Sequence, residues 1–257
     1  MKPEPGRAFD VCGGELSELR LLQLADSALP IGALAHSFGL ESLTSREVLQ
    51  VADLPSFLRG YLEEAGLVEA VFCRAAYGLA GTNAREFSVE RWIELNDWLS
   101  ARKPARESCA GSAALGLNLL QAVIALGDFP ILHQALLAAA KSRLADRVRP
   151  VLDENRPVLI HHSAAFGLAC GVLCIEKERA MLAFLHQLIA SLVSACQRLL
   201  PLGQAAATRI LWDLKPALIR MARRSASCAL DDAYCFTAAL DWGAMEHPAL
   251  STRLFIS

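Results

Sequence analysis

The sequence predicts an all-α fold, a single-domain bundle of roughly ten helices, and three observations lead to this prediction. Apolar residues recur at helical spacing along most of the chain, and no stretch of useful length alternates as a half-buried strand would. Proline and glycine interrupt the apolar segments at intervals that suit helices of ordinary length. The chain has 257 residues, of which 54% are hydrophobic, so it can bury a sizeable core as one domain.

The first predicted helix leads into the segment 21–41, which contains the first predicted break. Four leucines at helical spacing belong to this helix, namely Leu16, Leu19, Leu22 and Leu24. Pro30 and Gly32 end it, because proline lacks the amide donor and clashes with the preceding turn, and a second apolar run starts at Leu34. We expect the bend to be a recognition surface or a helix corner, and the polar residues near it are Asp26, Ser27, His36, Ser37 and Glu41.

Two helices are predicted between residues 53 and 103. The first begins at Asp53-Leu54-Pro55, since proline is tolerated in the first turn, and its apolar positions keep helical spacing until the stretch from Gly78 to Asn83. Ser88 is the predicted N-cap of the second helix, and Lys103-Pro104 ends it.

Further breaks divide the rest of the chain. Asp128-Phe129-Pro130 starts a helix that runs through Leu144, and Asn155-Arg156-Pro157 marks the clearest break in the middle of the sequence. Pro201-Leu202-Gly203 precedes an amphipathic helix that closes at Arg223-Arg224-Ser225, and the short segment 230–240 is again apolar.

Three segments contain no charged side chain, and they raise the question of a membrane protein. These segments are 108–127, 157–175 and 180–197, each close to the length that crosses a bilayer. Their polar residues are costly in hydrocarbon, and the flanks lack aromatic belts and one-sided basic loops. The sequence therefore predicts helices at the centre of a bundle or at subunit interfaces, and no membrane span.

Charge and cysteine content narrow the class further. The formal net charge of −2 gives no electrostatic reason to expect nucleic acid as a partner. Residues 1–15 read as a flexible tail without the apolar segment of a secretion signal, so a cytoplasmic location is expected. The 8 cysteines are scattered through helical pattern, which favours free, buried thiols.

Few residues suggest chemistry. His162, Cys170 and Cys174 fall at multiples of four and could hold zinc, nickel or copper, but buried thiols beside a histidine explain the same pattern. His36 could be a general base beside Ser37, but a hydrogen-bonded structural histidine at a helix start is the favoured interpretation. Motifs for a nucleophile, a phosphate loop or paired metal ligands are absent from the sequence. The sequence therefore predicts no catalytic residue, no cofactor and no metal site.

Two further features favour contact with partners. Arg198 follows a long uncharged helix and could either point toward an anionic partner or cap carbonyl groups at the helix end. The C-terminus is apolar where most termini are polar, and its apolar residues are Leu250, Leu254, Phe255 and Ile256. Such a tail docks either on its own core or in the groove of a partner.

Five segments together resemble the urease accessory protein UreF family, in order and spacing from about residue 19 to the end. They are LLQLADSALPIGALAHSFGLE (21–41), ARKPARES (101–108), HHSAAFGLACG (161–171), QRLLPLGQ (197–204) and DWGAMEHPALSTRLFIS (241–257). The sequence departs from the family pattern at Ala33-Leu34, at Phe38 and at Ile256, and the last departure concerns details of tail contacts.

The resemblance implies an all-α, homodimeric, non-enzymatic cytoplasmic chaperone. It would bind the UreD/UreH protein and recruit the GTPase UreG, and the complex would act on apo-urease to install nickel in a GTP-dependent way. By similarity, the all-α domain spans 16–240 and a partner-docking tail spans 241–257. A nickel carrier or metal-dependent enzyme that uses His162, Cys170 and Cys174 is the alternative.

The resemblance also assigns two sets of contact residues. The expected contacts with UreD/UreH are Met245, Glu246, His247, Arg253, Leu254 and Phe255. The expected UreG-facing residues are His36, Ser37, Glu41, Arg198 and Gln204. A sharper hypothesis makes Arg198 a trans-acting arginine that stabilises charge on GTP bound to UreG.

Overall fold

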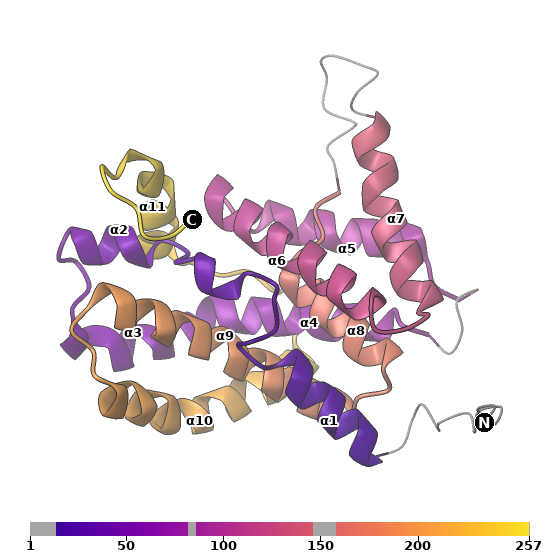
Figure 1. The fold of residues 1–257 in the computed structure, drawn as a ribbon, viewed down its shortest axis with the longest axis horizontal. Coiled ribbons are helices and arrows are strands. Elements are labelled where there is room, and N and C mark those ends of the chain that lie inside the picture. The colour runs from indigo at the N-terminus through magenta and orange to yellow at the C-terminus, as the bar shows by residue number, and fades with distance from the viewer. Residues whose placement is uncertain (1–13, 82–85, 146–157, 257) are drawn as a thin grey trace, which may run out of the picture.

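The computed structural model describes residues 14–81, 86–145 and 158–256, and within these ranges it contains helices and no strand (Figure 1). The all-α prediction is therefore confirmed. The elements in chain order are α1 (Gly14–Leu24), η1 (Ala33–Ala35), α2 (Leu40–Ser45), η2 (Val51–Asp53), α3 (Leu54–Tyr61), η3 (Leu62–Gly66), α4 (Leu67–Gly78), α5 (Val89–Ala101), α6 (Arg106–Ile124), α7 (Pro130–Ala145), α8 (His162–Val172), α9 (Lys177–Leu199), α10 (Gln204–Ser227), α11 (Ala238–Glu246) and η4 (His247–Ala249).

Helices α4 and α8 form the centre of the core. Every residue from His162 to Cys170 is buried, so the second charge-free segment lies inside the bundle as predicted. Gly167 and Gly171 allow the close approach, because a Cβ at either position would overlap the backbone of α4 at Cys73 or Tyr77. The absence of charge in this segment follows from burial on all sides.

The predicted long helix after Asp53 is present, with one irregularity. Its helical path changes at η3, a π-helical turn between α3 and α4. A π-turn widens the helix locally and changes the direction of its side chains. Here Glu64 accepts a hydrogen bond from the backbone N–H of Phe236 at 3.0 Å, so the turn contacts the non-helical segment that precedes α11.

Helices α9 and α10 pack against each other and against α4. The turn 200–203 between them confirms the predicted break. Arg74 of α4 donates two hydrogen bonds to the carboxylate of Glu178, at 2.6 and 2.8 Å, and so ties α4 to the start of α9. Ser88 is the N-cap of α5 as predicted, since its hydroxyl accepts from the N–H of Arg91 at 3.2 Å.

Helix α11 packs on α2 where two glycines meet, at the upper left of Figure 1. Gly39 has a φ of +93°, a conformation that suits glycine, and a Cβ at this position would collide with the backbone of Leu240 and Ala244. Gly243 lies equally close to the backbone of Gly39. The predicted docking tail 241–257 therefore begins inside a helix that is already part of the packed domain.

Several expectations need correction or lie outside the described residues. Gly14 and Glu15, which the sequence placed in a flexible tail, belong to α1. The predicted break at residues 155–157 lies outside the described residues. The expectation of free, buried thiols holds only in part, because six described cysteines are free, three of these are only partly buried, and Cys174 is disulfide-bonded.

One described helix is long and apolar enough to cross a membrane. This helix is α9, and 56% of its most apolar window is buried inside the fold. Burial of more than half of these residues fits a core helix, because a lipid-facing helix leaves its apolar side chains on the outside of the protein.

Candidate functional site

The carboxylate of Glu41 is the centre of a cluster that holds the C-terminal tail. Glu41 lies in the first turn of α2 and is 5% exposed. It accepts hydrogen bonds from the backbone N–H of Leu254 at 2.6 Å and from that of Phe255 at 3.2 Å. These two backbone N–H groups, together with the side chain of His247, replace the water that a carboxyl group loses on burial.

The side chain of His247 is fully buried between two carboxylates. Its Nε2 lies 2.9 Å from a Glu41 oxygen, and its Nδ1 lies 2.7 Å from an oxygen of Glu107 on α6. His247 therefore links α2 and α6 through its two ring nitrogens.

Arg198, at the end of α9, contacts the other side of the tail. Its guanidinium donates to the carbonyl of Leu34 at 2.7 Å and to that of Leu254 at 3.3 Å, and it lies 4.2 Å from the centroid of the Phe255 ring. The N–H of Ile256 donates to the carbonyl of Ala35 at 2.8 Å. We call the group formed by Glu41, His247, Arg198 and the tail residues 254–256 the tail clamp.

The tail clamp divides the apolar side chains of the C-terminus into two groups. Phe255 is buried at 5% exposure, under Arg198 and beside Glu41. Leu254 and Ile256 are 63% and 70% exposed, and Met245 at the end of α11 is 54% exposed. The tail is thus fixed by its polar backbone and one aromatic ring, while its other apolar side chains face outward.

The structure brings together residues that the sequence assigned to different partners. Glu41 and Arg198, expected to face UreG, directly contact Leu254 and Phe255, expected to face UreD/UreH. A buried Glu41 cannot touch a partner while the tail is docked. The assignment of the predicted UreG-facing residues, His36, Ser37, Glu41, Arg198 and Gln204, stays a prediction. The observed contacts give Glu41 and Arg198 a role in positioning the tail.

The remaining predicted residues lie around the clamp or near it. His36 is buried, with its ring 5.7 Å from that of Phe38, and burial lowers the pKa of its imidazole. Ser37 is fully buried, and Gln204 is exposed at the start of α10. Glu246 forms an ion pair with Arg46 of the chain segment after α2.

Arg253 and Glu107 complete the rim of the clamp. Arg253 is half exposed, and its guanidinium lies 4.0 Å from a Glu107 oxygen. Glu107 is a functional candidate that the sequence reasoning did not identify, although it lies within the ARKPARES segment. A carboxylate in the first turn of a helix is explained locally, by its favourable interaction with the helix dipole. The sequence therefore offers no reason to expect the contact of Glu107 with His247.

The candidate metal ligands do not form a site in the described part of the chain. No group of three or more His, Cys, Asp and Glu side chains with suitable placement occurs there. Burial raises the pKa of the Cys170 thiol and lowers the pKa of His162 to about 4, so the environment favours an uncharged thiol and an uncharged ring. The interpretation as buried structural residues fits Cys170.

The neighbouring His161 is also structural. Its two ring nitrogens lie 2.8 Å from the hydroxyl of Ser100 and 3.1 Å from that of Ser112. Its backbone N–H donates to the side chain of Asn96 at 2.9 Å. Burial lowers its pKa to about 3, so the ring is neutral and joins α5, α6 and α8 in one buried network.

The chain is an all-α protein whose C-terminal tail is fixed on its own helices while Leu254 and Ile256 face outward, and exposed apolar side chains of this kind are typical of binding surfaces. The family model UreF matches residues 48–215. The chain is 30% identical over 243 residues to the urease accessory protein UreF of Thermosynechococcus vestitus, covering 93% of this chain and 97% of the relative. It is 30% identical over 238 residues to that of Haemophilus influenzae, covering 92% and 94%. The chain belongs to the UreF family of urease accessory proteins.

Proposed function

We propose that this chain is a non-enzymatic assembly scaffold of urease maturation. In this proposal it binds UreD/UreH through its C-terminal tail and recruits the GTPase UreG. The complex then acts on apo-urease, where GTP-dependent assembly of the nickel centre takes place. The family membership supports the pathway, and the tail clamp supports the way in which partners bind.

The observation that carries the proposal is the outward display of Leu254 and Ile256 on an ordered terminus. Each of these side chains is more than half exposed, whereas Phe255 between them is buried. Ordering a terminus costs conformational entropy, and exposed apolar side chains on it are unfavourable until a partner covers them. Together with Met245 they offer UreD/UreH an apolar contact of fixed shape.

The same contacts support a link between the two partner surfaces. The segment 33–41 holds the tail through Ala35 and Glu41, and it also contains His36 and Ser37, which the family resemblance assigns to UreG. We therefore propose that UreG binds beside the docked tail. In this arrangement Glu41 and Arg198 act indirectly, because they fix the tail and the segment 33–41 against each other.

Homodimer formation and a cytoplasmic location belong to the proposal as well. Other exposed apolar side chains are available for a subunit interface, including Trp212 and Ile219 on α10 and Leu19 and Leu22 on α1. The distribution of these residues over separate helices is compatible with more than one interface per chain.

A matched pair of substitutions tests the tail contact. Leu254→Asp places a charge in the proposed interface, whereas Leu126→Asp places the same charge at another leucine of equal exposure, 63% in both cases. We expect Leu254→Asp to lose co-purification with UreD/UreH and Leu126→Asp to retain it. Wild-type recovery of UreD/UreH by Leu254→Asp would overturn the tail assignment.

The scaffold role is tested by GTP hydrolysis. We expect the purified chain to hydrolyse no GTP alone, and the complex with UreD/UreH and UreG to show hydrolysis that depends on UreG. Hydrolysis by the chain without UreG contradicts the proposal. Nickel-dependent urease activity in cells that express Leu254→Asp should fall together with the loss of UreD/UreH binding.

A further inference from the structure

The non-helical chain between α10 and α11 is fixed on the helices beneath it. Arg102, which follows α5, donates from its guanidinium to the carbonyl of Leu230 at 3.1 Å and to that of Ala233. The backbone N–H of Phe236 donates to the carboxylate of Glu64 on η3 at 3.0 Å. These contacts give the segment one path over α5 and η3, so the direction of its side chains is set by the fold.

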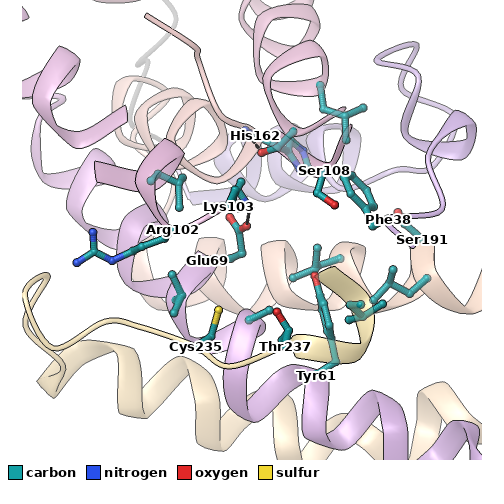
Figure 2. Close-up of a pocket in the computed structure, with 18 of the residues that line it drawn as sticks. Phe38, Tyr61, Glu69, Arg102, Lys103, Ser108, His162, Ser191, Cys235 and Thr237 are labelled. Atoms are coloured by element: carbon teal, nitrogen blue, oxygen red, sulfur yellow. Dashed lines mark hydrogen bonds and ion pairs between the residues drawn. The ribbon is translucent and has the colours of Figure 1, made fainter. Parts of the chain in front are cut away.

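Side chains along this segment alternate between the inside and the outside of the protein. Ala233 is 2% exposed, and Cys235 and Thr237 are partly buried and line a pocket beneath the segment (Figure 2). Tyr234 and Phe236 are 76% and 82% exposed, the two largest values among the large apolar side chains of the described residues. Alternation with a period of two is that of extended backbone, so both rings lie on the outer face.

The two outward rings have no partner within the described part of the chain. Neither Tyr234 nor Phe236 forms an aromatic contact, a cation–π contact or a side-chain hydrogen bond with another described residue. Exposed rings on an ordered segment are unfavourable in water, and tyrosine and phenylalanine are enriched at protein interfaces. The outer face of this segment is therefore a candidate binding surface, and it shares no residue with the tail clamp.

Two neighbouring carboxylates give this surface a negative charge. Asp231 and Asp232 lie in the turn that precedes the rings, and both are exposed. Their side chains form no hydrogen bond or ion pair with any described residue. The guanidinium of Arg102 is occupied by backbone carbonyls, and Arg220 of α10 is paired with Glu63 at 3.5 Å. The two aspartates are thus available to a cation on a partner.

The negative charge decides between kinds of partner. Exposed aromatic rings also occur in proteins that bind anionic lipid or single-stranded nucleic acid, but the phosphates of both are repelled by carboxylates. Two carboxylates alone are a small donor set for a metal ion, and no group of three or more possible ligands occurs among the described residues. The guanidinium of arginine suits both features, because it bonds carboxylates through two N–H groups and stacks on aromatic rings.

We infer that residues 231–236, here called the aromatic segment, bind an extended, arginine-containing segment of a partner protein. In this contact guanidinium groups pair with the two carboxylates and stack on the two rings. Every second side chain of an extended peptide lies on one face, so arginines at alternate positions reach both groups. The inference goes beyond the scaffold role, because it adds a contact surface outside the tail clamp.

Three capped octapeptides serve as probes, in which leucine alternates with arginine, lysine or glutamate. Each is titrated into the full-length chain while the backbone amides are followed by ¹H–¹⁵N NMR. We expect the arginine peptide to bind with shifts centred on residues 231–236. The lysine peptide should bind at least about threefold more weakly, because an ammonium group cannot pair with a carboxylate through a planar fork. The glutamate peptide should not bind.

A matched pair of double variants tests the carboxylates. Asp231→Asn/Asp232→Asn removes two negative charges from the aromatic segment and keeps the shape of the side chains. It should weaken binding of the arginine peptide by at least about fivefold. Glu15→Gln/Asp128→Asn makes the same change in net charge at two exposed carboxylates elsewhere, and it should bind within about twofold of the wild type.

A second set of variants tests the rings. Tyr234→Ser/Phe236→Ser should also weaken binding of the arginine peptide by at least about fivefold. Because both rings are exposed, this variant should unfold at the same temperature as the wild type, measured by circular dichroism. Trp212→Ser removes a ring that is 63% exposed on α10, and it should bind the peptide as the wild type does.

Four results would overturn the inference. They are absence of binding of the arginine peptide, equal binding of the glutamate peptide, affinity that either double variant of the aromatic segment leaves unchanged, and binding of the wild-type chain to phosphatidylglycerol vesicles through the same residues. The last result would identify a lipid surface as the occupant.

Self-association provides a further check by analytical ultracentrifugation. If Asp231→Asn/Asp232→Asn abolishes self-association of the wild-type chain, the occupant is a second copy and the inference is wrong. We expect the oligomeric state to be unchanged. None of these measurements involves UreD/UreH, so failure here and failure of the scaffold proposal are distinguishable.

Discussion

The backbone N–H of Phe255 donates to the carboxylate of Glu41 across 214 positions of sequence, at 3.2 Å. The bond joins the first turn of α2 to the end of the chain. Because Leu254 donates to the same carboxylate, one side chain holds two consecutive residues of the tail. Replacing that side chain is therefore the most direct way to disturb tail docking.

Glu41→Gln should release the tail while leaving the helical domain folded. A carboxamide presents one acceptor oxygen and turns an NH₂ group toward donors, so it cannot accept from both backbone N–H groups and from His247. We expect hydrogen exchange at the amides of Leu254 and Phe255 to speed up by roughly tenfold or more. Glu94→Gln, an exposed site on α5, is the matched control. Unchanged protection in Glu41→Gln contradicts the central role of this carboxylate.

Arg198 and Phe255 should act as one unit in the recruitment of UreG. If Arg198 works by holding the tail, Arg198→Ala and Phe255→Ala weaken UreG recruitment, and the double variant is little worse than either single variant. If Arg198 instead stabilises charge on GTP, Arg198→Ala lowers GTP hydrolysis in a complex that still assembles. We expect the first pattern, because the guanidinium already contacts Leu34, Leu254 and Phe255. Pull-down assays and GTPase rates on the same four proteins separate the two outcomes.

Gly39→Ala should separate α2 from α11. The φ of +93° is strained for alanine, and the added Cβ collides with backbone atoms of α11 that cannot move independently. We expect a loss of roughly 2 kcal/mol or more in the free energy of unfolding, measured with urea. Gly60→Ala in α3 is the control, since nothing lies within 4 Å of the point that its Cβ would occupy, and it should be neutral or slightly stabilising. Equal effects of the two substitutions would show that the glycine contact is unimportant.

Acid should destabilise the fold through its buried histidines. The pKa of His161 is lowered to about 3 and that of His162 to about 4, both below the value near 6.5 of an unfolded chain. Below pH 6.5 the unfolded chain therefore binds more protons than the folded one, and stability falls as the pH decreases toward these folded values.

The measurement is the free energy of unfolding between pH 7.5 and 5, before most carboxylates titrate. His36 and His186 add to the slope in the same direction, because burial lowers their pKa as well. His162→Phe should reduce the slope by about one proton, which is about 1.4 kcal/mol per pH unit. A slope identical to that of the wild type would contradict a depressed pKa at His162.

Local signals in the sequence were sufficient to predict most helices. Ser88, Pro130 and the 201–203 turn mark helix ends through backbone chemistry that acts within a few residues, so their positions could be predicted closely. The π-turn between α3 and α4 could not, because it leaves the apolar spacing of the segment 54–78 nearly unchanged.

The site was only partly predictable. The polar residues of the segment 21–41 and the apolar tail each stood out in the sequence, and the resemblance assigned them to different partners. Their mutual contact depends on how α2, α6, α9 and η4 are arranged in space, which no local pattern encodes. For the same reason Glu107 was overlooked beside His247.

His247 bonds to carboxylates on both α2 and α6, and Arg198 on α9 contacts the same tail. The acceptors and donors that fix the last residues therefore come from three helices spread over the whole sequence, and they are in place only when those helices have packed. A partner that recognised the docked tail would therefore select copies in which α2, α6 and α9 have already packed, and it would pass over copies in which they have not.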